Sequence, residues 1–422
     1  MKDLSKIKVG VIGLGYVGLP LAVSFSKKYQ TVGFDISHER IKELENNFDR
    51  TLELSNSKLK NSKIKFFNQI ESLNSIDVFI VTVPTPVNFQ NQPDLSALKS
   101  ACKSIAKVMK KQSVIIFEST VYPGCTEEVC IPLLKKGSKL VLNKDFFVGY
   151  SPERINPGDK VHTFEKINKV VSGSNAKSLK FIHDLYAGVI TAEVFAATSI
   201  KVAEASKVIE NTQRDINIAL MNELSEIFSK LDINTSDVLK ASGTKWNFLK
   251  FRPGLVGGHC IGVDPYYLSY KSKQIGVNPR MILSGRKTNN KVAARVANRV
   301  LEKLKNTKSS PKILILGLTF KENCPDIRNS GSINVIKELN RQDITPFVHD
   351  PYFQKDPCIQ KTRYNFIAKL FENRFKYDGI LLLAPHQEYL NLEPSEIRKL
   401  TKAKGYIFDM TNSHGQEDFD SL

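Results

Sequence analysis

Short apolar runs and longer amphipathic stretches alternate along the first 150 residues of the chain. The runs at 7–12, 31–35, 77–83, 113–117 and 146–150 have the length and the β-branched content of buried strands. An amphipathic helix is expected from Leu19 to Lys28. Because strands that alternate with helices favour a doubly wound parallel sheet, this part of the chain is predicted to be an α/β domain.

The same pattern begins again near residue 306. A polar linker at 306–311 precedes a strand at 312–317, residues 347–350 resemble residues 32–35, and residues 378–385 resemble residues 77–84. We therefore expect a second, related α/β domain. Because this domain has no G-x-G-x-x-G turn, we expect it to bind a different nucleotide-like ligand.

The longest helical stretch, residues 198–230, contains no proline or glycine. Apolar side chains recur in it at helical spacing, and these are Val202, Ala205, Ile209, Ile216 and Leu220. Such a helix suits a connection between two domains or two subunits. The predicted architecture is two Rossmann-like, doubly wound parallel-sheet domains, at residues 1–197 and 306–422, joined by a long central helix within a helical domain at 198–305.

Composition and charge narrow the class of protein. With 422 residues, of which 41% are hydrophobic, the chain is long enough for two or three globular domains. The net charge of +18 is spread without an arginine-rich tract, so nucleic-acid binding is not expected as the main role. The six cysteines are scattered without a CxxC pair, which predicts a reduced, cytoplasmic protein without a metal site. We expect no signal peptide and no membrane insertion.

A glycine-rich turn follows the first predicted strand. Gly13, Gly15 and Gly18 fit the G-x-G-x-x-G pattern between a strand and a helix, with Tyr16 and Val17 in the variable positions. The first glycine permits the tight turn, the second lets a pyrophosphate approach the backbone, and the third lets helix and strand pack closely. The turn therefore predicts a dinucleotide site at a helix N-terminus.

The second predicted strand ends in an acid. Asp35 stands where such sites accept a hydrogen bond from a ribose hydroxyl, which favours NAD over NADP. Arg40 lies five residues further along, where it either stacks over the adenine or softens that preference.

The segment 257–267 holds the strongest candidate for covalent chemistry. Two glycines lie shortly before Cys260, and Asp264 follows four residues after it. A thiol and a carboxylate at this spacing can present a nucleophile and a proton carrier to one carbon. A lone cysteine is more often a buried small hydrophobe. Beside a nicotinamide cofactor, however, a thiol suggests that a carbonyl is oxidised through a thioester.

Further polar residues complete the candidate chemistry. Lys207 and Asn211 share one face of the long helix, with Glu204 one turn earlier, and a cation with an amide can stabilise a developing oxyanion. The alternative is a solvated charged face. Glu153 follows a predicted strand, where it is either a general base or a helix-capping acid. Residues 118–124 follow another strand, at the edge where such sheets bind ligands.

Seven motifs over nearly the whole chain stand in the order found in the UDP-glucose/GDP-mannose 6-dehydrogenase family, which the chain resembles. They are GLGYVG at 13, VPTP at 83, STVYPG at 119, SPER at 151, EASKVIEN at 204, GGHCIGVDP at 257 and GLTFKENCPDIR at 317. GGHC, in place of the GGSC loop of UDP-glucose dehydrogenases, resembles the branch that acts on UDP-N-acetylhexosamines.

The resemblance implies an NAD-dependent, four-electron oxidation of C6 of a UDP-N-acetylhexosamine to the uronate, for surface polysaccharide synthesis. UDP-GlcNAc or UDP-GalNAc is the favoured substrate. Cys260 would hold the reacting carbon first as a thiohemiacetal and then as a thioester. Lys207 and Asn211 would hold the oxygen that carries negative charge, and Asp264 and Glu153 would handle protons.

The resemblance also implies the ligand contacts. The cofactor-binding residues would be Gly13, Gly15, Tyr16, Val17, Gly18, Asp35, Arg40, Thr85, Thr120 and Arg328, and Thr120 would also help to hold a catalytic water. The substrate-binding residues would be Glu153, Arg154, Lys207, Asn211, Phe251, Arg252, Gly257, Phe320 and Lys321. Family members dimerise through the central helix, so Arg252 is expected to reach into the site of a neighbouring subunit.

The C-terminal end departs from the family pattern. Many relatives carry an arginine after the last strand that contacts the nucleotide, whereas this chain has Thr411 and Asn412, so that contact is not carried over. Residues 416–422 are polar and are expected to fray.

Three alternatives stay open. The first is a UDP-glucose 6-dehydrogenase. The second is a preference for UDP-ManNAc, whose axial acetamide would need a different pocket wall. The third is an NAD-sensing protein without catalysis, against which the intact Cys260, Lys207, Asn211 and Asp264 argue, because a sensor needs none of them.

Overall fold

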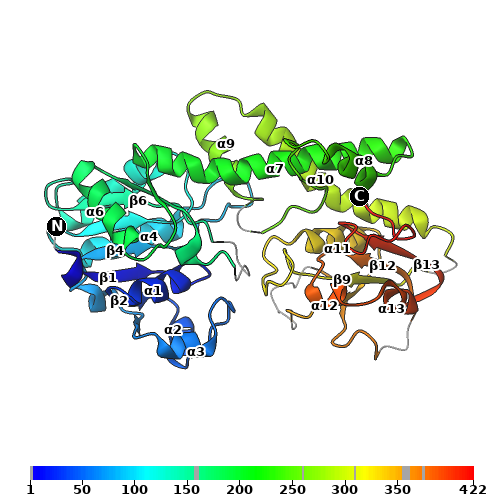
Figure 1. Ribbon diagram of the computed structural model, residues 1–422, viewed down its shortest axis with the longest axis horizontal. Helices are drawn as coiled ribbons and strands as arrows, with labels where there is room; N and C mark the ends of the chain where they lie inside the picture. Colours follow the sequence, from blue (N-terminus) through cyan, green and yellow to red (C-terminus); the bar gives the residue numbers. More distant parts are fainter. Residues whose placement is uncertain (1–2, 156–160, 259–260, 308–309, 354–361, 373–375) are drawn as a thin grey trace. The chain divides into compact units, whose positions relative to one another are not determined.

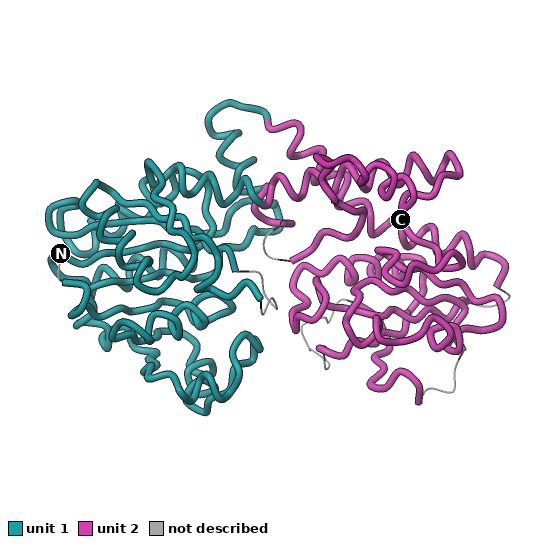
Figure 2. The backbone as a smooth tube through the Cα atoms, viewed as in Figure 1, with its two compact units in different colours: residues 1–210, 266–278 teal, residues 211–265, 279–422 magenta. Residues whose placement is uncertain are grey.

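The computed structural model describes residues 3–155, 161–258, 261–307, 310–353, 362–372 and 376–422. They form two compact units (Figure 2). Unit 1 comprises residues 1–210 and 266–278, and unit 2 comprises residues 211–265 and 279–422. Each unit is built around its own sheet of mainly parallel strands, as the alternation of strands and helices predicts.

The described part of unit 1 contains an eight-stranded sheet in the order β3-β2-β1-β4-β5-β6-β7-β8. Its strands β1, β2, β4 and β6 are labelled in Figure 1. Its neighbouring strands run parallel except β6 and β7, which are antiparallel, so the predicted doubly wound parallel sheet is confirmed with one antiparallel pair. A parallel pair needs a crossover, usually a helix, and the described part of the β6–β7 connection holds only a short 3-10 turn. The strands are β1 (Lys8–Ile12), β2 (Gln30–Phe34), β3 (Lys65–Phe67), β4 (Val78–Val81), β5 (Val114–Phe117), β6 (Phe147–Tyr150), β7 (Lys169–Gly173) and β8 (Val194–Ala196).

The helices of unit 1 begin at capping side chains in several cases. Ser37 caps α2, Ser55 caps α3, and Asn175 forms a capping box with Ser178 at the start of α6. The helical segments are η1 (Leu4–Lys6), α1 (Gly18–Ser26), α2 (His38–Glu45), α3 (Asn56–Asn61), η2 (Ile70–Leu73), α4 (Ser96–Val108), the π-helical η3 (Thr126–Cys130), α5 (Ile131–Ser138), η4 (Phe164–Lys166) and α6 (Ala176–Ala187). Helix α1 thus begins one residue before the predicted start at Leu19 and ends two residues before the predicted end at Lys28.

The core of unit 1 shows why its strands read as continuous apolar runs. Val78 and Ile80 of β4 belong to a cluster that α1 and α6 also line, whereas Phe79 and Val81 are equally buried but lie outside this cluster. Alternate residues of a strand point to opposite faces, so both faces of the sheet are covered.

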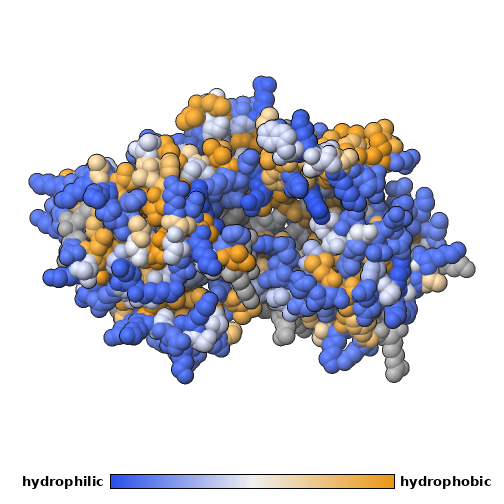
Figure 3. Space-filling view, viewed as in Figure 1, coloured by the Kyte–Doolittle hydropathy of each residue, from blue (hydrophilic) through white to orange (hydrophobic). Residues whose placement is uncertain are grey.

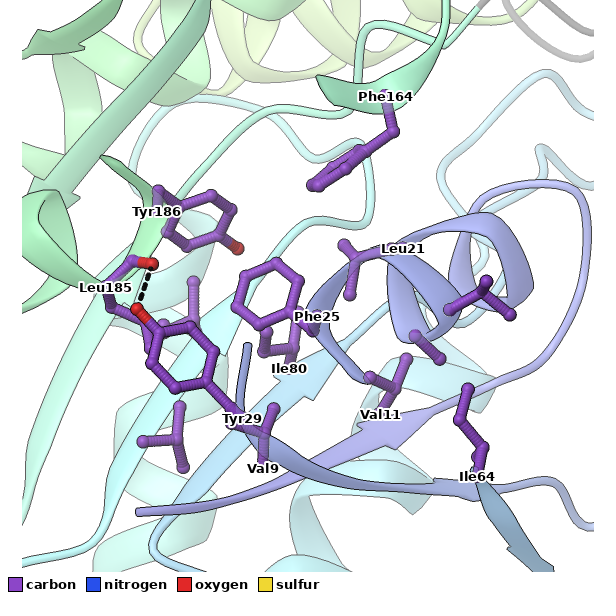
Figure 4. Close-up of a cluster of buried hydrophobic side chains, with 14 of the residues drawn as sticks. Val9, Val11, Leu21, Phe25, Tyr29, Ile64, Ile80, Phe164, Leu185 and Tyr186 are labelled. Carbon is purple, nitrogen blue, oxygen red and sulfur yellow. Dashed lines mark hydrogen bonds between the residues drawn. The ribbon is translucent and has the colours of Figure 1, made fainter. Parts of the chain in front are cut away.

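Aromatic rings fill one of these two layers (Figure 4). The ring of Phe25 on α1 meets Tyr186 on α6 edge-on, with the centroids 5.3 Å apart. The hydroxyl of Tyr29 donates to the carbonyl of Leu185 at 3.0 Å, so this polar group is satisfied inside the core. These contacts join the first and the last helices of the layer.

The described residues of unit 2 repeat the arrangement in a five-stranded sheet ordered β11-β10-β9-β12-β13, with these neighbouring strands parallel. Helices α10 and α11 pack on one face, and α12 and α13 lie over the other. The strands are β9 (Ile313–Leu316), β10 (Phe347–His349), β11 (Asn365–Phe366), β12 (Tyr377–Leu382) and β13 (Thr401–Asp409). The helices of this part are α10 (Arg280–Lys303), α11 (Gly331–Arg341), α12 (Gln387–Leu390) and α13 (Pro394–Lys399).

The predicted internal repeat is confirmed by the turns that follow the first strand of each unit, β1 and β9. In unit 1, Gly13 has φ +93° and the carboxylate of Asp35 accepts from the amide of Leu14. In unit 2, Gly317 has φ +92° and the carboxylate of Asp350 accepts from the amide of Leu318. In both units, the acid that ends the second strand holds the turn that ends the first strand.

Helix α7 (Ile200–Lys230) is the predicted long helix, and it continues from unit 1 into unit 2. Its 31 residues correspond to about 46 Å at 1.5 Å per residue. Two shorter helices follow it, α8 (Thr235–Ser242) and α9 (Asp264–Gln274). Segment 257–267, which contains the candidate nucleophile, therefore leads directly into a helix.

The C-terminal tail is not frayed, so that expectation is wrong. Phe419 and Leu422 are buried, and the guanidinium of Arg299 on α10 binds the carboxylate of Asp420. The hydroxyl of Tyr406 donates to the same carboxylate. The backbone of Asp420 also bonds to Ile407 and Asp409, and Arg398 pairs with Asp418. These long-range contacts order a tail that is mainly polar, which composition alone does not reveal.

We predict that Phe419→Ala lowers the stability of unit 2 by about 3 kcal/mol, because the ring fills a core position that a methyl group leaves empty. Phe371→Ala is the matched control, since Phe371 is 54% exposed and its loss should change stability by less than about 0.5 kcal/mol. Chemical denaturation followed by circular dichroism measures both. Equal effects of the two substitutions would show that packing of the tail contributes nothing to the free energy of unfolding.

Candidate active site

The glycine-rich turn between β1 and α1 has the geometry that a dinucleotide requires. A Cβ on Gly13 would lie 3.2 Å from the backbone of Thr82, and a Cβ on Gly18 would lie 1.8 Å from the carbonyl oxygen of Gly13. By contrast, a Cβ on Gly15 would meet nothing within 4 Å. Gly13 and Gly18 thus close the turn, and Gly15 leaves backbone open to a ligand at the start of α1. Tyr16 and Val17 lie half-buried between them.

Asp35 has a structural task besides its predicted contact with a ribose. One carboxylate oxygen accepts from the amide of Leu14 at 2.9 Å, and the other accepts from the amide of Ser37 at 2.9 Å. Arg40 is buried, and its guanidinium donates to the carbonyl of Leu14 and pairs with Asp49 at 2.7 Å. The predicted acid and the predicted arginine therefore both brace the glycine-rich turn from the protein side.

Thr85 and Thr120 lie together at the carboxyl edge of the unit 1 sheet. The hydroxyl of Thr85 donates to the carbonyl of Thr120 at 2.6 Å. The hydroxyl of Tyr267 donates to the carbonyl of Thr85 at 2.8 Å, so a side chain of α9 holds the same loop. The two residues predicted for the cofactor are thus in direct contact with each other.

Glu153 and Lys207 form a buried pair in unit 1. The ammonium of Lys207 lies 3.5 Å from one carboxylate oxygen of Glu153, and both residues are at most 8% exposed. The other carboxylate oxygen of Glu153 is buried and has no hydrogen-bond partner among the described residues. A buried oxygen of this kind needs a partner that the described residues do not supply, such as a water or a ligand hydroxyl. Glu153 lies in a loop after β6 and not in a cap, so the capping alternative is wrong.

A second buried ion pair, between Lys169 and Glu118, holds the loop that carries Glu153. The ammonium of Lys169 donates to the carbonyl of Pro152 at 2.9 Å and to the carboxylate of Glu118 at 2.6 Å. Burial raises the pKa of Glu118, although the ammonium of Lys169 opposes the rise. Next in the loop, Arg154 pairs with Glu210 and donates to the carbonyl of Asn168.

One turn further along α7, Asn211 contacts Asp264 within unit 2. The side-chain amide of Asn211 donates to the carboxylate of Asp264 at 2.6 Å, and Asp264 is 1% exposed at the start of α9. Glu204, Lys207 and Asn211 are all buried, so the alternative of a solvated charged face is wrong. Successive turns of one helix therefore present polar side chains to partners on other elements.

Cys260, the predicted nucleophile, and His259 lie outside the described residues. The glycines before them contact the loop after β9 in unit 2. A Cβ on Gly257 would lie 2.6 Å from the carbonyl oxygen of Asn329, and a Cβ on Gly258, where φ is +81°, would lie 2.6 Å from the ring of Phe320. The paired glycines thus permit a close approach to two residues of segment 317–331.

Segment 317–331 also carries the other residues predicted to contact ligands from unit 2. Lys321 is half-buried beside Phe320, and the guanidinium of Arg328 pairs with the buried carboxylate of Asp326 at 2.8 Å. Before the glycines, Phe251 is half-buried and Arg252 is exposed. Thr411 is half-buried, and the side chain of Asn412 donates to Ser236 at 3.1 Å.

A buried histidine anchors the first half of this segment. His386 lies 3.1 Å from Asp350 and 3.1 Å from Thr319, and the amide of Asn323 donates to its Nδ1 atom. Burial opposes ionisation of Asp350, but hydrogen bonds from His386 and from the amides of Leu318 and Thr319 hold its pKa below the usual value.

The sequence argument assigned no role to Glu118, Lys169, Glu204, Tyr267 and His386. Their residue types are common in ordinary proteins, and nothing in their spacing marks them as partners. The available signal was position, because Glu118, Glu204 and Tyr267 lie inside the quoted motifs or next to them.

Two kinds of feature are absent from the described residues. These residues include no group of three or more His, Cys, Asp or Glu side chains that could hold a metal ion. Within the same residues, no helix is long and apolar enough to cross a membrane. Hydrophilic residues dominate the face shown in Figure 3, with hydrophobic patches among them.

Family models match the chain in three consecutive parts. Residues 7–203 match the NAD binding domain of the UDP-glucose/GDP-mannose dehydrogenase family, residues 201–291 match its central domain, and residues 314–416 match its UDP binding domain.

Curated relatives align with nearly the whole chain. Protein CapL of Staphylococcus aureus is 51% identical over 405 residues, which cover 95% of each chain. The UDP-N-acetyl-D-glucosamine 6-dehydrogenases of Pseudomonas aeruginosa and Salmonella typhi are 50% and 47% identical, with 97% of each chain covered.

Solved structures share the fold. The UDP-D-ManNAc dehydrogenase of Pyrococcus horikoshii superimposes with a TM-score of 0.86 at 29% identity, covering 99% of each chain. The UDP-N-acetyl-mannosamine dehydrogenase Cap5O of Staphylococcus aureus has a TM-score of 0.84 at 31% identity, covering 98% of this chain and 97% of that chain.

The position of Asp35 predicts the choice of cofactor. Its carboxylate should repel a 2′-phosphate, so the wild-type protein should prefer NAD over NADP at least about tenfold. Asp35→Ala should narrow this ratio, chiefly by weakening NAD, because it removes the acceptor for the ribose hydroxyl and the charge that repels the 2′-phosphate. Loss of the hydrogen bond to Leu14 should weaken both cofactors alike. Initial rates with both cofactors give the ratio.

Asp77→Ala is the control for this substitution. Asp77 accepts from the amide of Lys8 at the opposite edge of the same sheet, so its loss should leave the cofactor ratio unchanged. Equal use of NAD and NADP by the wild-type protein would show that Arg40 or another basic residue governs the ribose end.

Proposed function

Because the chain belongs to the UDP-glucose/GDP-mannose dehydrogenase family and is an NAD-dependent dehydrogenase, we propose that it oxidises C6 of a UDP-N-acetylhexosamine to the uronate. UDP-GlcNAc or UDP-GalNAc is the favoured substrate, and UDP-glucose is the runner-up. The buried oxygen of Glu153 beside Lys207 is the observation that carries this proposal, because the pair offers a proton acceptor and a cation to the oxygen on one sugar carbon. The names of the relatives support the acetamido sugar.

The proposed reaction balances in two oxidations. Bound NAD supplies the acceptor for the two electrons that are removed at each oxidation. The C6 alcohol first becomes an aldehyde, and the sulfur of Cys260 adds to the aldehyde carbon. The second oxidation turns this thiohemiacetal into a thioester, and water hydrolyses the C–S bond. One sugar, two NAD⁺ and one water thus give one uronate, two NADH and three protons.

The residues of unit 1 serve this chemistry through charge and proton transfer. Lys207 stabilises the oxygen at C6 as it gains negative charge, and Glu153 moves protons at the same oxygen. Thr120 helps to hold the water for hydrolysis. Arg154 binds the substrate next to Glu153.

The residues of unit 2 hold the substrate and complete the proton path. Asn211 shares the stabilisation of the charged oxygen, and Asp264, to which it donates, takes part in proton transfer. The other proposed contacts with the sugar nucleotide are Phe251, Arg252, Gly257, Phe320 and Lys321.

The proposed cofactor site combines the open backbone at Gly15 with the carboxylate of Asp35. The remaining proposed contacts with NAD are Gly13, Tyr16, Val17, Gly18, Arg40, Thr85, Thr120 and Arg328. We propose a division into an NAD-binding domain at 1–197, a central helical domain at 198–305 and a UDP-sugar-binding domain at 306–422. The protein would act in the cytoplasm, in the synthesis of a surface polysaccharide.

A panel of UDP-sugars tests this proposal. We predict that UDP-GlcNAc or UDP-GalNAc has a kcat/KM at least about a hundredfold above that of UDP-glucose, because loss of the acetamide strands its buried partners. Two NADH should form per uronate, without free aldehyde. Initial NADH rates at low sugar concentration and the final ratio of products measure both. A higher kcat/KM for UDP-glucose would instead support the runner-up.

Two cysteine variants control this test. Cys260→Ala should abolish uronate formation and leave NAD binding near normal, since the glycine-rich turn lies elsewhere in the chain. Cys102→Ala removes another thiol, which is buried on α4, and should retain activity. Near wild-type turnover of Cys260→Ala would remove the nucleophile assignment, and NAD binding without any sugar oxidation would favour the sensor.

We also propose a homodimer that forms through α7. Four exposed apolar side chains lie along this helix, at Val202, Ile209, Leu220 and Ile227. Their separations of seven, eleven and seven residues place them within about 20° of one another at 100° per residue. Such a stripe is the seam along which two helices pack. Arg252, which is exposed, would then reach the site of the partner.

The dimer has its own test. Ile209→Asp should reduce the mass in solution from twice the monomer mass to that of a monomer, because a charge in the seam must be desolvated. Ile275→Asp places the same change on an exposed isoleucine away from α7 and should leave the mass unchanged. Light scattering after size exclusion measures both. A dimeric Ile209→Asp protein would exclude this seam.

A further inference from the structure

Glu204 is a buried acid of α7 that the proposed chemistry does not use. Its side chain is inaccessible to solvent and lies one helical turn before Lys207. One carboxylate oxygen accepts from the amide of Gly124 at 2.5 Å, and the other accepts from the amide of Thr126 at 2.8 Å. Both oxygens are thus bound to backbone outside the helix.

The two amides belong to the end of a loop that carries Thr120. The loop follows the end of β5 at Phe117 and turns at Gly124, where φ is +95°, before it enters η3. Its first half is fixed by the hydrogen bond from Thr85 to the carbonyl of Thr120. Its second half is fixed to α7 by Glu204. The loop is therefore held between the proposed cofactor site and the helix that presents Lys207.

The charge on Glu204 changes within the physiological range. Burial raises the pKa of Glu204 to about 7, against the hydrogen bonds from Thr126 and Gly124, and the charge of Glu127 adds to the rise. The ionised carboxylate accepts from both amides, whereas the protonated acid loses one acceptor, since its hydroxyl cannot accept equally well.

Other charged groups surround this part of the loop. Glu127 on η3 pairs with Lys201 on α7 at 3.2 Å. Glu128, whose side chain lies beside Gly124, pairs with Lys271 on α9 at 2.5 Å. Each neighbouring acid therefore has a cation beside it. Two further titratable groups belong to the same loop: the thiol of Cys125, between the two amides, and Tyr122, whose pKa is raised by burial so that it stays protonated near neutral pH. Among these groups, only the carboxylate of Glu204 accepts from the two amides.

We propose that Glu204 is a positioning residue, whose ionised carboxylate fixes the Thr120 loop relative to Lys207 and whose protonation releases the loop and slows turnover. This role rests on the proposed dehydrogenase activity for its kinetic consequence, but not for its structural one. An ordinary capping residue lies at the start of the helix that it caps, and its exposed side chain loses little hydration energy there. Glu204 instead lies on a different element and is buried, where an ionised carboxylate costs stability.

The sign of the stability effect follows from the raised pKa. The acid titrates near 4.5 in the unfolded chain and about 7 in the folded protein, so folding favours its protonated form. The stabilisation is complete below pH 4.5 and is lost as the pH rises through about 7. The ionised form that positions the loop is thus the less stable one.

Glu204→Gln tests the role in activity, because a side-chain amide has one acceptor and carries no charge at any pH. At pH 8.5 we expect kcat to fall by about ten- to a hundredfold, the scale for a misplacement of about 1 Å. The ratio of wild-type kcat to variant kcat should rise with pH, with a midpoint near 7. Glu127→Gln is the matched control and should keep the wild-type activity with a slightly lower midpoint.

Hydrogen exchange of the wild-type protein, without NAD or sugar, tests the contacts directly. After correction for intrinsic rates, the peptide that contains Gly124 and Thr126 should become more protected as the pH rises from 6 to 8.5. The Glu127→Gln protein should show the same change, and the Glu204→Gln protein should not.

Each outcome decides the proposal. A pH-dependent activity ratio with pH-dependent protection supports it. A ratio that is constant with pH would make Glu204 merely structural, and a ratio of one would leave it without a role. If Glu204→Gln does not fold, hydrogen exchange of the wild-type protein tests the proposal by itself. Exchange protection of the Gly124–Thr126 peptide that does not vary with pH would then overturn the proposal. If no sugar is oxidised, the proposed activity fails, while the exchange result still stands or falls by itself.

Discussion

The fold depends on one constraint, which is that the buried polar side chains of α7 must find partners on other elements. Glu204 binds the amides at the start of η3, Lys207 lies beside Glu153, and Asn211 donates to Asp264. An unpaired group of this kind would cost about 1–3 kcal/mol or more. Within unit 1 the helix therefore holds the loops after β5 and β6, and within unit 2 it holds the start of α9.

The turn after the first strand is held in the same way in both units. In each unit, an acid at the end of the second strand accepts from the turn after the first strand, and a glycine with positive φ makes that turn possible. In unit 1 the turn leaves Gly15 open for a phosphate. In unit 2, Asp350 is joined by His386, and the loop that follows carries Phe320 and Lys321. A repeated scaffold thus supports two different ligand sites.

Buried charge appears where position matters for the chemistry. Lys169 and Glu118 form an ion pair inside unit 1, and the same ammonium holds the carbonyl of Pro152 next to Glu153. Such a pair is expensive to desolvate and adds little net stability. Its benefit is a fixed geometry for the loop, and Glu204 provides the same benefit for the loop after β5. The protein therefore accepts a loss of stability to hold these two loops in place.

The amino-acid order was enough to predict the alternation of strands and helices, the glycine-rich turn, the internal repeat and the motifs of the family, because these depend on local spacing and on residue types with narrow conformational or chemical uses. Only the folded chain shows that Glu204 and Lys207 are buried and not solvated, that the C-terminal tail packs through Phe419, and that β6 and β7 run antiparallel. Each of these depends on contacts between residues far apart in the chain. Helical spacing assigns a side chain to a face, but only the neighbouring elements determine whether that face meets water or a partner.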